Sequence, residues 1–232
     1  MQTELIDYTD KEVLLEAFVA HSGVGKRPLV ILCHAWAGRN EFICEKARAV
    51  AELGYVGFAL DIYGKGIIGR SKEENASLKK PFLEDRHRLH RRLLKGIEKA
   101  ASLPYVDASR IAAIGYGFGG LCALDLARIR EDLKGAVSIY GHFEPPPFPH
   151  KKIQAKLLLL HGANDPTVPI QELFAFTETI TTDWQAHIYG NTFHGFPNPP
   201  ANDRAGGILY NPLAAERSWL AVENFLTEIF PQ

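Results

Sequence analysis

The sequence predicts an α/β fold in which helices cover both faces of a doubly wound, mostly parallel sheet. Short apolar runs alternate along the chain with longer segments of helical periodicity. The apolar runs are continuous rather than alternating with polar residues, which is typical of parallel strands buried on both faces. No internal repeat and no Ser- or Gly-rich linker divides the chain, so we expect one domain over residues 1–232.

The expected elements follow one another in a strand–helix order. A segment at 12–19 is expected to add an antiparallel edge strand ahead of them. Gly54 and Pro104 follow the first two helices, as residues that end helices commonly do. The other assignments are strands at 29–33, 55–60, 110–114, 136–140, 156–160 and 184–189, and helices at 42–53, 82–103, 118–130, 170–180 and 212–229.

Composition and charge narrow the class of protein. The 232 residues are 46% hydrophobic, enough to bury a substantial core. A formal net charge of −1 argues against nucleic-acid or membrane-surface partners, which favour a basic excess. The first residues lack the apolar run of a signal peptide, and apolar stretches such as 157–160 are too short to span a bilayer. Three cysteines without a CxxC pair are typical of free thiols, so we expect a cytoplasmic protein.

One segment carries most of the functional signal: it runs from an apolar strand, through four glycines in six residues, into a helix. Two incompatible functions fit it. The spacing Gly115-x-Gly117-x-x-Gly120 is that of the phosphate-binding turn in a dinucleotide-binding oxidoreductase. The spacing Gly115-x-Gly117-x-Gly119 is that of the nucleophile elbow of an α/β-hydrolase, with Gly117 at the nucleophile position.

Residues further along the chain favour the hydrolase. A dinucleotide motif usually follows the first strand of its sheet, whereas at least two predicted strands precede Gly115. In α/β-hydrolases the nucleophile, the acid and the base follow one another in that order. Asp165 follows the strand at 156–160, and His194 follows the strand at 184–189. Both therefore fall in loops at the carboxyl ends of strands, where ligands of open α/β sheets bind.

Four blocks of sequence resemble the dienelactone hydrolase family of α/β-hydrolases. They are CHAWAGRN at 33–40, GYGFGG at 115–120, HGANDPTVP at 161–169 and FHGF at 193–196. The resemblance extends over nearly the whole chain and implies an α/β-hydrolase fold. It also implies Asp165 as the acid, His194 as the base, and an oxyanion hole made by the backbone N–H groups of Trp36 and Phe118. The family's usual nucleophile is a Cys, which here is replaced by Gly117.

Two further departures from the family concern the substrate. Family members that open dienelactones carry a Glu beside the oxyanion loop, where this chain has Ala35. They also carry an Arg just after the catalytic His, where this chain has Pro197 and Asn198. The resemblance therefore implies a hydrolase of small esters or lactones without specifying dienelactone.

Gly117 changes what the site is expected to do. An acyl-transfer triad needs a nucleophile whose proton passes to a base, and glycine has no side chain to attack with. We expect the chain to be inactive or strongly impaired, with water activated by His194 as a residual route. Cys33, Cys44 and Cys122 are expected to be buried and inert.

The alternative functions are a catalytically silent small-molecule binding protein and, less favoured, the dinucleotide-dependent oxidoreductase. A natural loss, an engineered change and an error in the recorded residue are three origins that fit Gly117.

The remaining polar residues are expected to support the site or to face solvent. His161 is expected to support the acid loop, and His34 to position the oxyanion loop. Loops at 63–69 and 198–211 are expected to wall the pocket. The run 86–95, rich in Arg and His, is interpreted as a solvated helix face.

The chain has no HExxH motif or Cys cluster, so we expect no metal and no cofactor. We expect a monomer or weak homodimer whose partner is a small ester or lactone.

Overall fold

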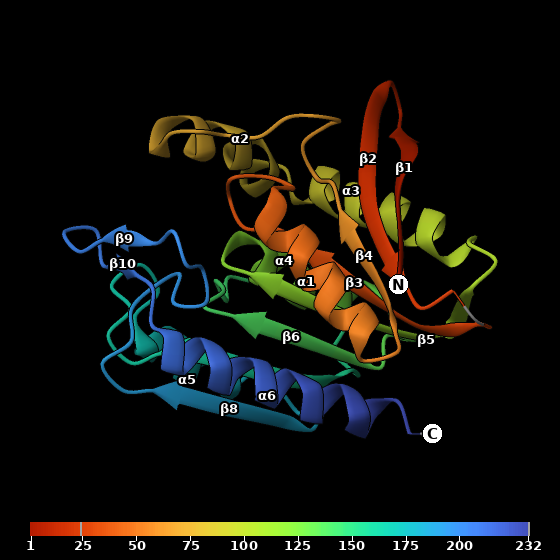
Figure 1. Cartoon of the computed structure of the whole chain (residues 1–232). Coiled ribbons are helices and arrows are strands. Elements are labelled where there is room, and N and C mark those ends of the chain that lie inside the picture. Colours follow the sequence, from red (N-terminus) through yellow and green to blue (C-terminus); the bar gives the residue numbers. More distant parts are fainter. Residues whose placement is uncertain (24, 232) are drawn as a thin grey trace.

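The computed structural model describes residues 1–23 and 25–231, and its central feature is an eight-stranded sheet in the order β1-β2-β4-β3-β5-β6-β7-β8 (Figure 1). β1 pairs antiparallel with β2, and β2 pairs antiparallel with β4, whereas the strands from β4 to β8 are parallel. The strands are β1 (Gln2–Asp10), β2 (Val13–His21), β3 (Arg27–Cys33), β4 (Val56–Leu60), β5 (Val106–Tyr116), β6 (Gly135–Ile139), β7 (Lys156–Gly162) and β8 (Trp184–Tyr189).

Helices cover both faces of this sheet. α1 and α6 lie over one face, and α3, α4 and α5 over the other (Figure 1), so two separate apolar layers form the core. The helices are α1 (Glu41–Glu52), α2 (Lys72–Glu84), α3 (Arg86–Ala101), α4 (Phe118–Ile129), α5 (Ile170–Thr177) and α6 (Pro212–Ile229). A small hairpin, β9 (Asn202–Asp203) and β10 (Ile208–Leu209), precedes α6. The predicted doubly wound, mostly parallel fold is confirmed.

The N-terminal edge of the sheet differs from the prediction. The antiparallel strand expected at 12–19 is present as β2, but it is the second strand rather than the edge. β1 forms the edge and pairs with all of β2, from Gln2 opposite His21 to Asp10 opposite Val13. Most of β1 is exposed, with only its last part alternating between buried and exposed residues. Such a polar strand lacks the apolar run on which the prediction relied.

The single helix expected at 82–103 is in fact two helices. Asp85 separates α2 from α3 with φ −121° and ψ 85°, which is outside the helical region. Its carboxylate accepts a hydrogen bond from the backbone N–H of Arg88 at 2.9 Å, so it caps the start of α3. In α2 only Asn75 and Phe82 are buried. Because α2 is so polar, the sequence carried little periodic signal for it.

The expectation of a solvated face at the Arg- and His-rich start of α3 is wrong for three of its side chains. Arg86, His90 and Arg92 are 4%, 7% and 1% exposed. Arg86 and His90 both bind Asp125 of α4, and Arg92 binds Asp10 at the end of β1. Basic side chains are rarely fully buried without a partner. These basic side chains therefore join α3 to α4 and to the edge of the sheet.

Candidate active site

The glycine-rich turn between β5 and α4 is one residue long. β5 ends at Tyr116 and α4 begins at Phe118, so Gly117 alone connects them. Its φ of +56° and ψ of −114° lie in a region that residues with a Cβ rarely adopt. Gly119 allows a close approach, because a Cβ there would lie 2.0 Å from the carbonyl oxygen of Cys33. The start of α4 is thereby held against the carboxyl end of β3.

The predicted acid and base meet in the structure. His194 Nδ1 lies 2.8 Å from Asp165 Oδ2. Asp165 Oδ1 accepts the backbone N–H groups of Thr167 and Val168 at 2.8 and 2.9 Å. A carboxylate can only accept hydrogen bonds, so Nδ1 of His194 must carry the hydrogen. Nε2 is left as the imidazole atom that can take up a proton.

His194 Nε2 faces the turn at Gly117. A Cβ at position 117 would lie 3.8 Å from Nε2 and 2.9 Å from Tyr140 Cε2. Tyr140, just after β6, is buried, has a φ of +42° and packs edge-on against the imidazole of His194 at 4.8 Å between ring centroids. The structure thus brings Gly117, Asp165 and His194 together, with the ring of Tyr140 beside the position where a nucleophile would begin.

The two residues expected to supply the oxyanion hole lie on either side of Tyr63. Phe118 is the first residue of α4, and Trp36 lies in the loop after β3. Tyr63 stacks on Phe118 with ring centroids 6.2 Å apart, and its hydroxyl donates to the carbonyl oxygen of Trp36 at 2.9 Å. Within residues 1–23 and 25–231, the backbone N–H groups of Trp36 and Phe118 donate to no other protein group. An N–H group without a protein acceptor can donate to a ligand oxygen.

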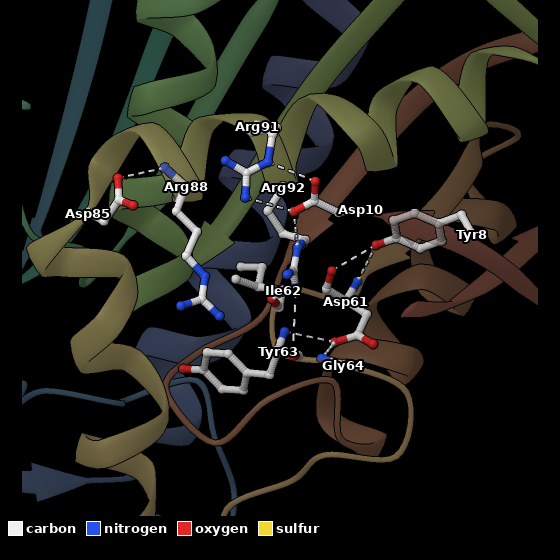
Figure 2. Close-up of polar contacts among 10 residues, drawn as sticks. All are labelled: Tyr8, Asp10, Asp61, Ile62, Tyr63, Gly64, Asp85, Arg88, Arg91 and Arg92. Carbon is white, nitrogen blue, oxygen red and sulfur yellow. Dashed lines mark hydrogen bonds and ion pairs between the residues drawn. The ribbon is translucent and has the colours of Figure 1, made fainter. Parts of the chain in front are cut away.

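Tyr63 is held in turn by a buried network at the end of β4 (Figure 2). Asp61 Oδ1 accepts the backbone N–H groups of Tyr63 and of the following glycine, both at 3.0 Å. The hydroxyl of Tyr8 donates to the carbonyl oxygen of Asp61 at 2.7 Å. Arg92 Nη1 donates to the carbonyl oxygen of Ile62 at 2.6 Å. Sequence reasoning missed this network because its members come from β1, α3 and the turn after β4.

Two buried histidines hold the loops of the site. His34 Nε2 accepts the backbone N–H of Ile62 at 3.2 Å, while Nδ1 donates to the carbonyl oxygen of Ala35 at 2.7 Å. Burial lowers the pKa of His34, which favours this neutral form. His161 Nε2 donates to the carbonyl oxygen of Val168 at 2.9 Å, and burial lowers the pKa of His161 as well. Their contacts agree with the supporting roles expected from the sequence.

His142 lies near the site but was not singled out from the sequence. Its ring centroid is 6.3 Å from that of His194. Burial, together with the charges of Lys79 and His194, lowers the pKa of His142 to about 4. Lys79 belongs to α2 and places its ammonium 5.6 Å from the ring centroid of Trp36. Since α2 was not predicted, no sequence signal linked Lys79 to this region.

The two loops expected to wall the pocket contact the site through their backbones. Gly69 donates its N–H to the carbonyl oxygen of Ala37 at 2.9 Å, which ties the loop after β4 to the loop that carries Trp36. The backbone N–H of His194 donates to Gly207 at 3.1 Å, and Leu209 donates to the carbonyl oxygen of His194 at 3.1 Å. The hairpin β9–β10 therefore holds His194 by both of its backbone groups.

The cysteines do not replace the missing nucleophile. All three are buried and free. Burial raises the pKa of Cys33 to about 12 and also raises the pKa values of Cys44 and Cys122, so each stays a thiol. In the described part of the chain no group of three or more His, Cys, Asp or Glu side chains could hold a metal ion. None of its helices has the length and apolarity needed to cross a membrane.

The chain is similar to several known proteins. An uncharacterized Caenorhabditis elegans protein, K02A2.1, is 32% identical over 154 residues, which are 62% of this chain and 95% of that protein. The crystal structure of P91, a dienelactone hydrolase-like promiscuous phosphotriesterase from metagenomic libraries, has a TM-score of 0.90 and 30% identity, covering 99% of this chain and 98% of that chain.

A more distant structure extends the same likeness. Dienelactone hydrolase from Anabaena variabilis has a TM-score of 0.74 and 20% identity, and the match covers 98% of this chain and 97% of that chain. This likeness shows the fold alone. The model of the dienelactone hydrolase family matches residues 15–230. The chain therefore belongs to the dienelactone hydrolase family and has the α/β-hydrolase fold.

Proposed function

We propose that this chain has the site of a small-ester or lactone hydrolase in which Gly117 disables the covalent step. The observation that carries the proposal is the position of His194. Its Nδ1 binds Asp165 at 2.8 Å, and its Nε2 lies 3.8 Å from the point where a Cβ at position 117 would be. A base oriented by a carboxylate and aimed at the tip of a strand-to-helix turn is the arrangement that acyl transfer requires.

With a thiol at position 117 the chemistry would follow from this geometry. The sulfur, having lost its proton to His194, would attack the carbonyl carbon and form a C–S bond. The N–H groups of Trp36 and Phe118 would hold the oxyanion of the tetrahedral intermediate. His194 would then return the proton to the leaving alcohol oxygen as the C–O bond breaks. Water deprotonated by His194 would finally attack the thioester carbon, and the C–S bond would break to release the carboxylic acid as His194 returns the proton to the sulfur.

In the chain as it stands, only direct attack by water remains. His194 Nε2 would take a proton from a water molecule as its oxygen attacks the carbonyl carbon, and would give that proton to the alcohol oxygen as the ester C–O bond breaks. Serine proteases that lack a triad member keep roughly 10³–10⁴-fold catalysis over water, through binding and the oxyanion hole. We therefore expect a low rate that depends on His194. We propose a small ester or lactone as the partner.

Restoring a nucleophile tests the proposal. The parent, Gly117→Cys and Gly117→Ser would be assayed on a panel of activated esters and enol-lactones. A large gain in kcat/KM for the Cys variant on any of these substrates is expected. The absence of a gain in either variant, with both proteins folded by circular dichroism, would count against a functional acid–base pair.

A catalytically silent binding protein is the second candidate. One observation favours it: the ring of Tyr140 comes within 2.9 Å of the Cβ position at 117, so the packing is closed around a glycine. A binding protein would retain substrate-like esters without turnover, and Gly117→Cys would add no activity. A dinucleotide-dependent oxidoreductase would instead bind NAD(P), which a fluorescence titration detects; tight binding would overturn the hydrolase proposal.

A further inference from the structure

One cavity is lined by residues other than those proposed for the triad and the oxyanion hole. Its volume is about 600 Å³, and it lies between the segment joining β6 to β7 and helix α5. This volume falls within the range of roughly 300–1,000 Å³ that is usual for small-molecule sites. None of the residues proposed for acyl transfer lines it. The cavity is therefore a separate place at which a ligand could bind.

The inner wall of this cavity is apolar and well packed. Phe143, Ile153 and Phe176 line it, and all three side chains are buried. Phe143 and Phe176 stack with ring centroids 5.2 Å apart and an interplanar angle of 24°. Ile180 and Ala175 extend the apolar wall toward solvent. An aliphatic chain or a ring could replace water along this surface, which is favourable because apolar area is removed from water.

Arg128 brings a buried positive charge to the same cavity. It is 4% exposed, lines the cavity and lies with its guanidinium carbon 5.7 Å from the ring centroid of Phe176. Its Nη1 binds Asp125 Oδ1 at 3.0 Å, and Arg86 Nη2 binds Asp125 Oδ2 at 2.6 Å. Two guanidinium groups thus share one carboxylate. The cluster keeps a surplus positive charge, which favours an anion beside it.

The other charged side chains that line the cavity are exposed. Lys151 pairs at 2.7 Å with Glu131, and both side chains are more than half exposed. Glu144 and Glu172 also line the cavity and are exposed, and the carbonyl oxygen of Glu144 accepts a hydrogen bond from Arg86 Nη2 at 3.4 Å. The carboxylates of the lining are therefore solvated, whereas the positive charge of Arg128 is buried.

From these contacts we propose that the cavity binds an aliphatic monocarboxylate, with its carboxylate at Arg128 and its chain against Phe143 and Phe176. The apolar wall accounts for the chain, and the surplus charge of the Arg86–Asp125–Arg128 cluster accounts for the anionic group. A carboxylate at Arg128 would make a charge-assisted hydrogen bond inside a region of low dielectric. This inference needs no activity at His194 and is tested by binding alone.

Calorimetric titration of the full chain with octanoate and with octanol tests this site. We expect octanoate to bind with one-to-one stoichiometry and at least about tenfold more tightly than octanol, which has the same chain without the charge. Ala175→Trp would fill the mouth of the cavity and is expected to weaken the binding of octanoate at least tenfold. Phe174→Ala is the matched control, because Phe174 is on the same helix, is 50% exposed and does not line the cavity.

Two more variants locate the carboxylate. Arg128→Gln is expected to weaken the binding of octanoate at least tenfold while leaving the affinity for octanol unchanged. If that variant does not fold, Ala175→Trp decides alone. His194→Ala is expected to bind octanoate like the parent. Five results would overturn the proposal: no heat from octanoate with the parent, equal affinities for octanoate and octanol, unchanged octanoate binding by folded Arg128→Gln, full binding by Ala175→Trp, or loss of binding in His194→Ala.

Discussion

His194 and Asp165 are joined by a hydrogen bond of 2.8 Å between Nδ1 and Oδ2, and the free nitrogen of the imidazole faces a residue without a side chain. The carboxylate is 4% exposed and is held by two backbone N–H groups of its own loop. A buried carboxylate that orients an imidazole in this way is the arrangement of a catalytic triad, and it is the main reason for which we propose acyl-transfer chemistry here.

The carboxylate of Asp165 should be required once a nucleophile is present. In the Gly117→Cys background, Asp165→Asn is expected to lower kcat roughly 10³–10⁴-fold, because an amide no longer holds His194 in the required tautomer. Asn keeps an oxygen for the N–H groups of Thr167 and Val168, so the loop should remain in place. Asp183→Asn, at a surface carboxylate paired with Lys156, is the control. A loss of less than tenfold in steady-state assays would contradict the proposed role.

The ring of Tyr140 should make any side chain at position 117 costly. Gly117→Ala is expected to reduce the free energy of unfolding by about 2–3 kcal/mol. The reason is that alanine is strained at a φ of +56° and that its Cβ would lie 2.9 Å from Tyr140 Cε2. Gly54→Ala is the matched control: its φ is +90°, but a Cβ there meets nothing within 4 Å. Urea unfolding of both variants should show the larger loss at position 117. Equal losses would mean that Tyr140 does not restrict the site.

Tyr63 should act on turnover through Trp36. In the Gly117→Cys background, Tyr63→Phe removes the hydrogen bond to the carbonyl oxygen of Trp36 and is expected to lower kcat about 3–10-fold with little change in KM. Tyr105→Phe, which removes a hydroxyl bonded to Glu4 at the surface, should leave both constants unchanged. A change in KM alone, measured on one activated ester, would show that Tyr63 shapes binding rather than the oxyanion loop.

His142 should make stability depend on pH. Its pKa of about 4 in the folded chain is below the ordinary value of 6.5, chiefly because of burial. Between these values the unfolded chain binds a proton that the folded chain does not, so stability should rise with pH across this window. The free energy of unfolding should therefore fall between pH 7 and pH 4.5, and His142→Gln should reduce that fall by about 1–2 kcal/mol. The effect is kept to this size because the side chain of His142 is partly exposed to solvent. His34 and His161 remain in both proteins, so the difference isolates His142. Identical pH dependence in urea unfolding would refute the prediction.

The parts of the fold that the sequence predicted are those in which one local pattern suffices. The parallel strands appeared as continuous apolar runs, and the turn at Gly117 followed from the spacing of its glycines. Asp165 and His194 could be placed together because the carboxyl ends of parallel strands meet at one edge of a sheet. One domain, a cytoplasmic location and a monomer or weak dimer stay predictions.

The missed features depend on contacts between distant residues or on elements without an apolar pattern. β1 and α2 are largely polar on their exposed sides, so neither produced a periodic signal. The contact of Tyr8 with Asp61 joins residues 53 positions apart, and that of Arg86 with Asp125 joins residues 39 apart. Basic residues in a helix usually face solvent, and only the tertiary position of Asp125 shows that Arg86 does not.

We propose that the base, the acid and the oxyanion donors of this chain surround an absent nucleophile. The most direct test is the intact mass of Gly117→Cys after mixing with p-nitrophenyl acetate and quenching in acid. We predict rapid addition of one acetyl group at Cys in position 117, and slowing by about 10³-fold when His194→Ala is added. The parent, whose three cysteines are buried, should gain none. Acetylation at the same rate with and without His194, or no acetylation of the Cys variant, would contradict the account.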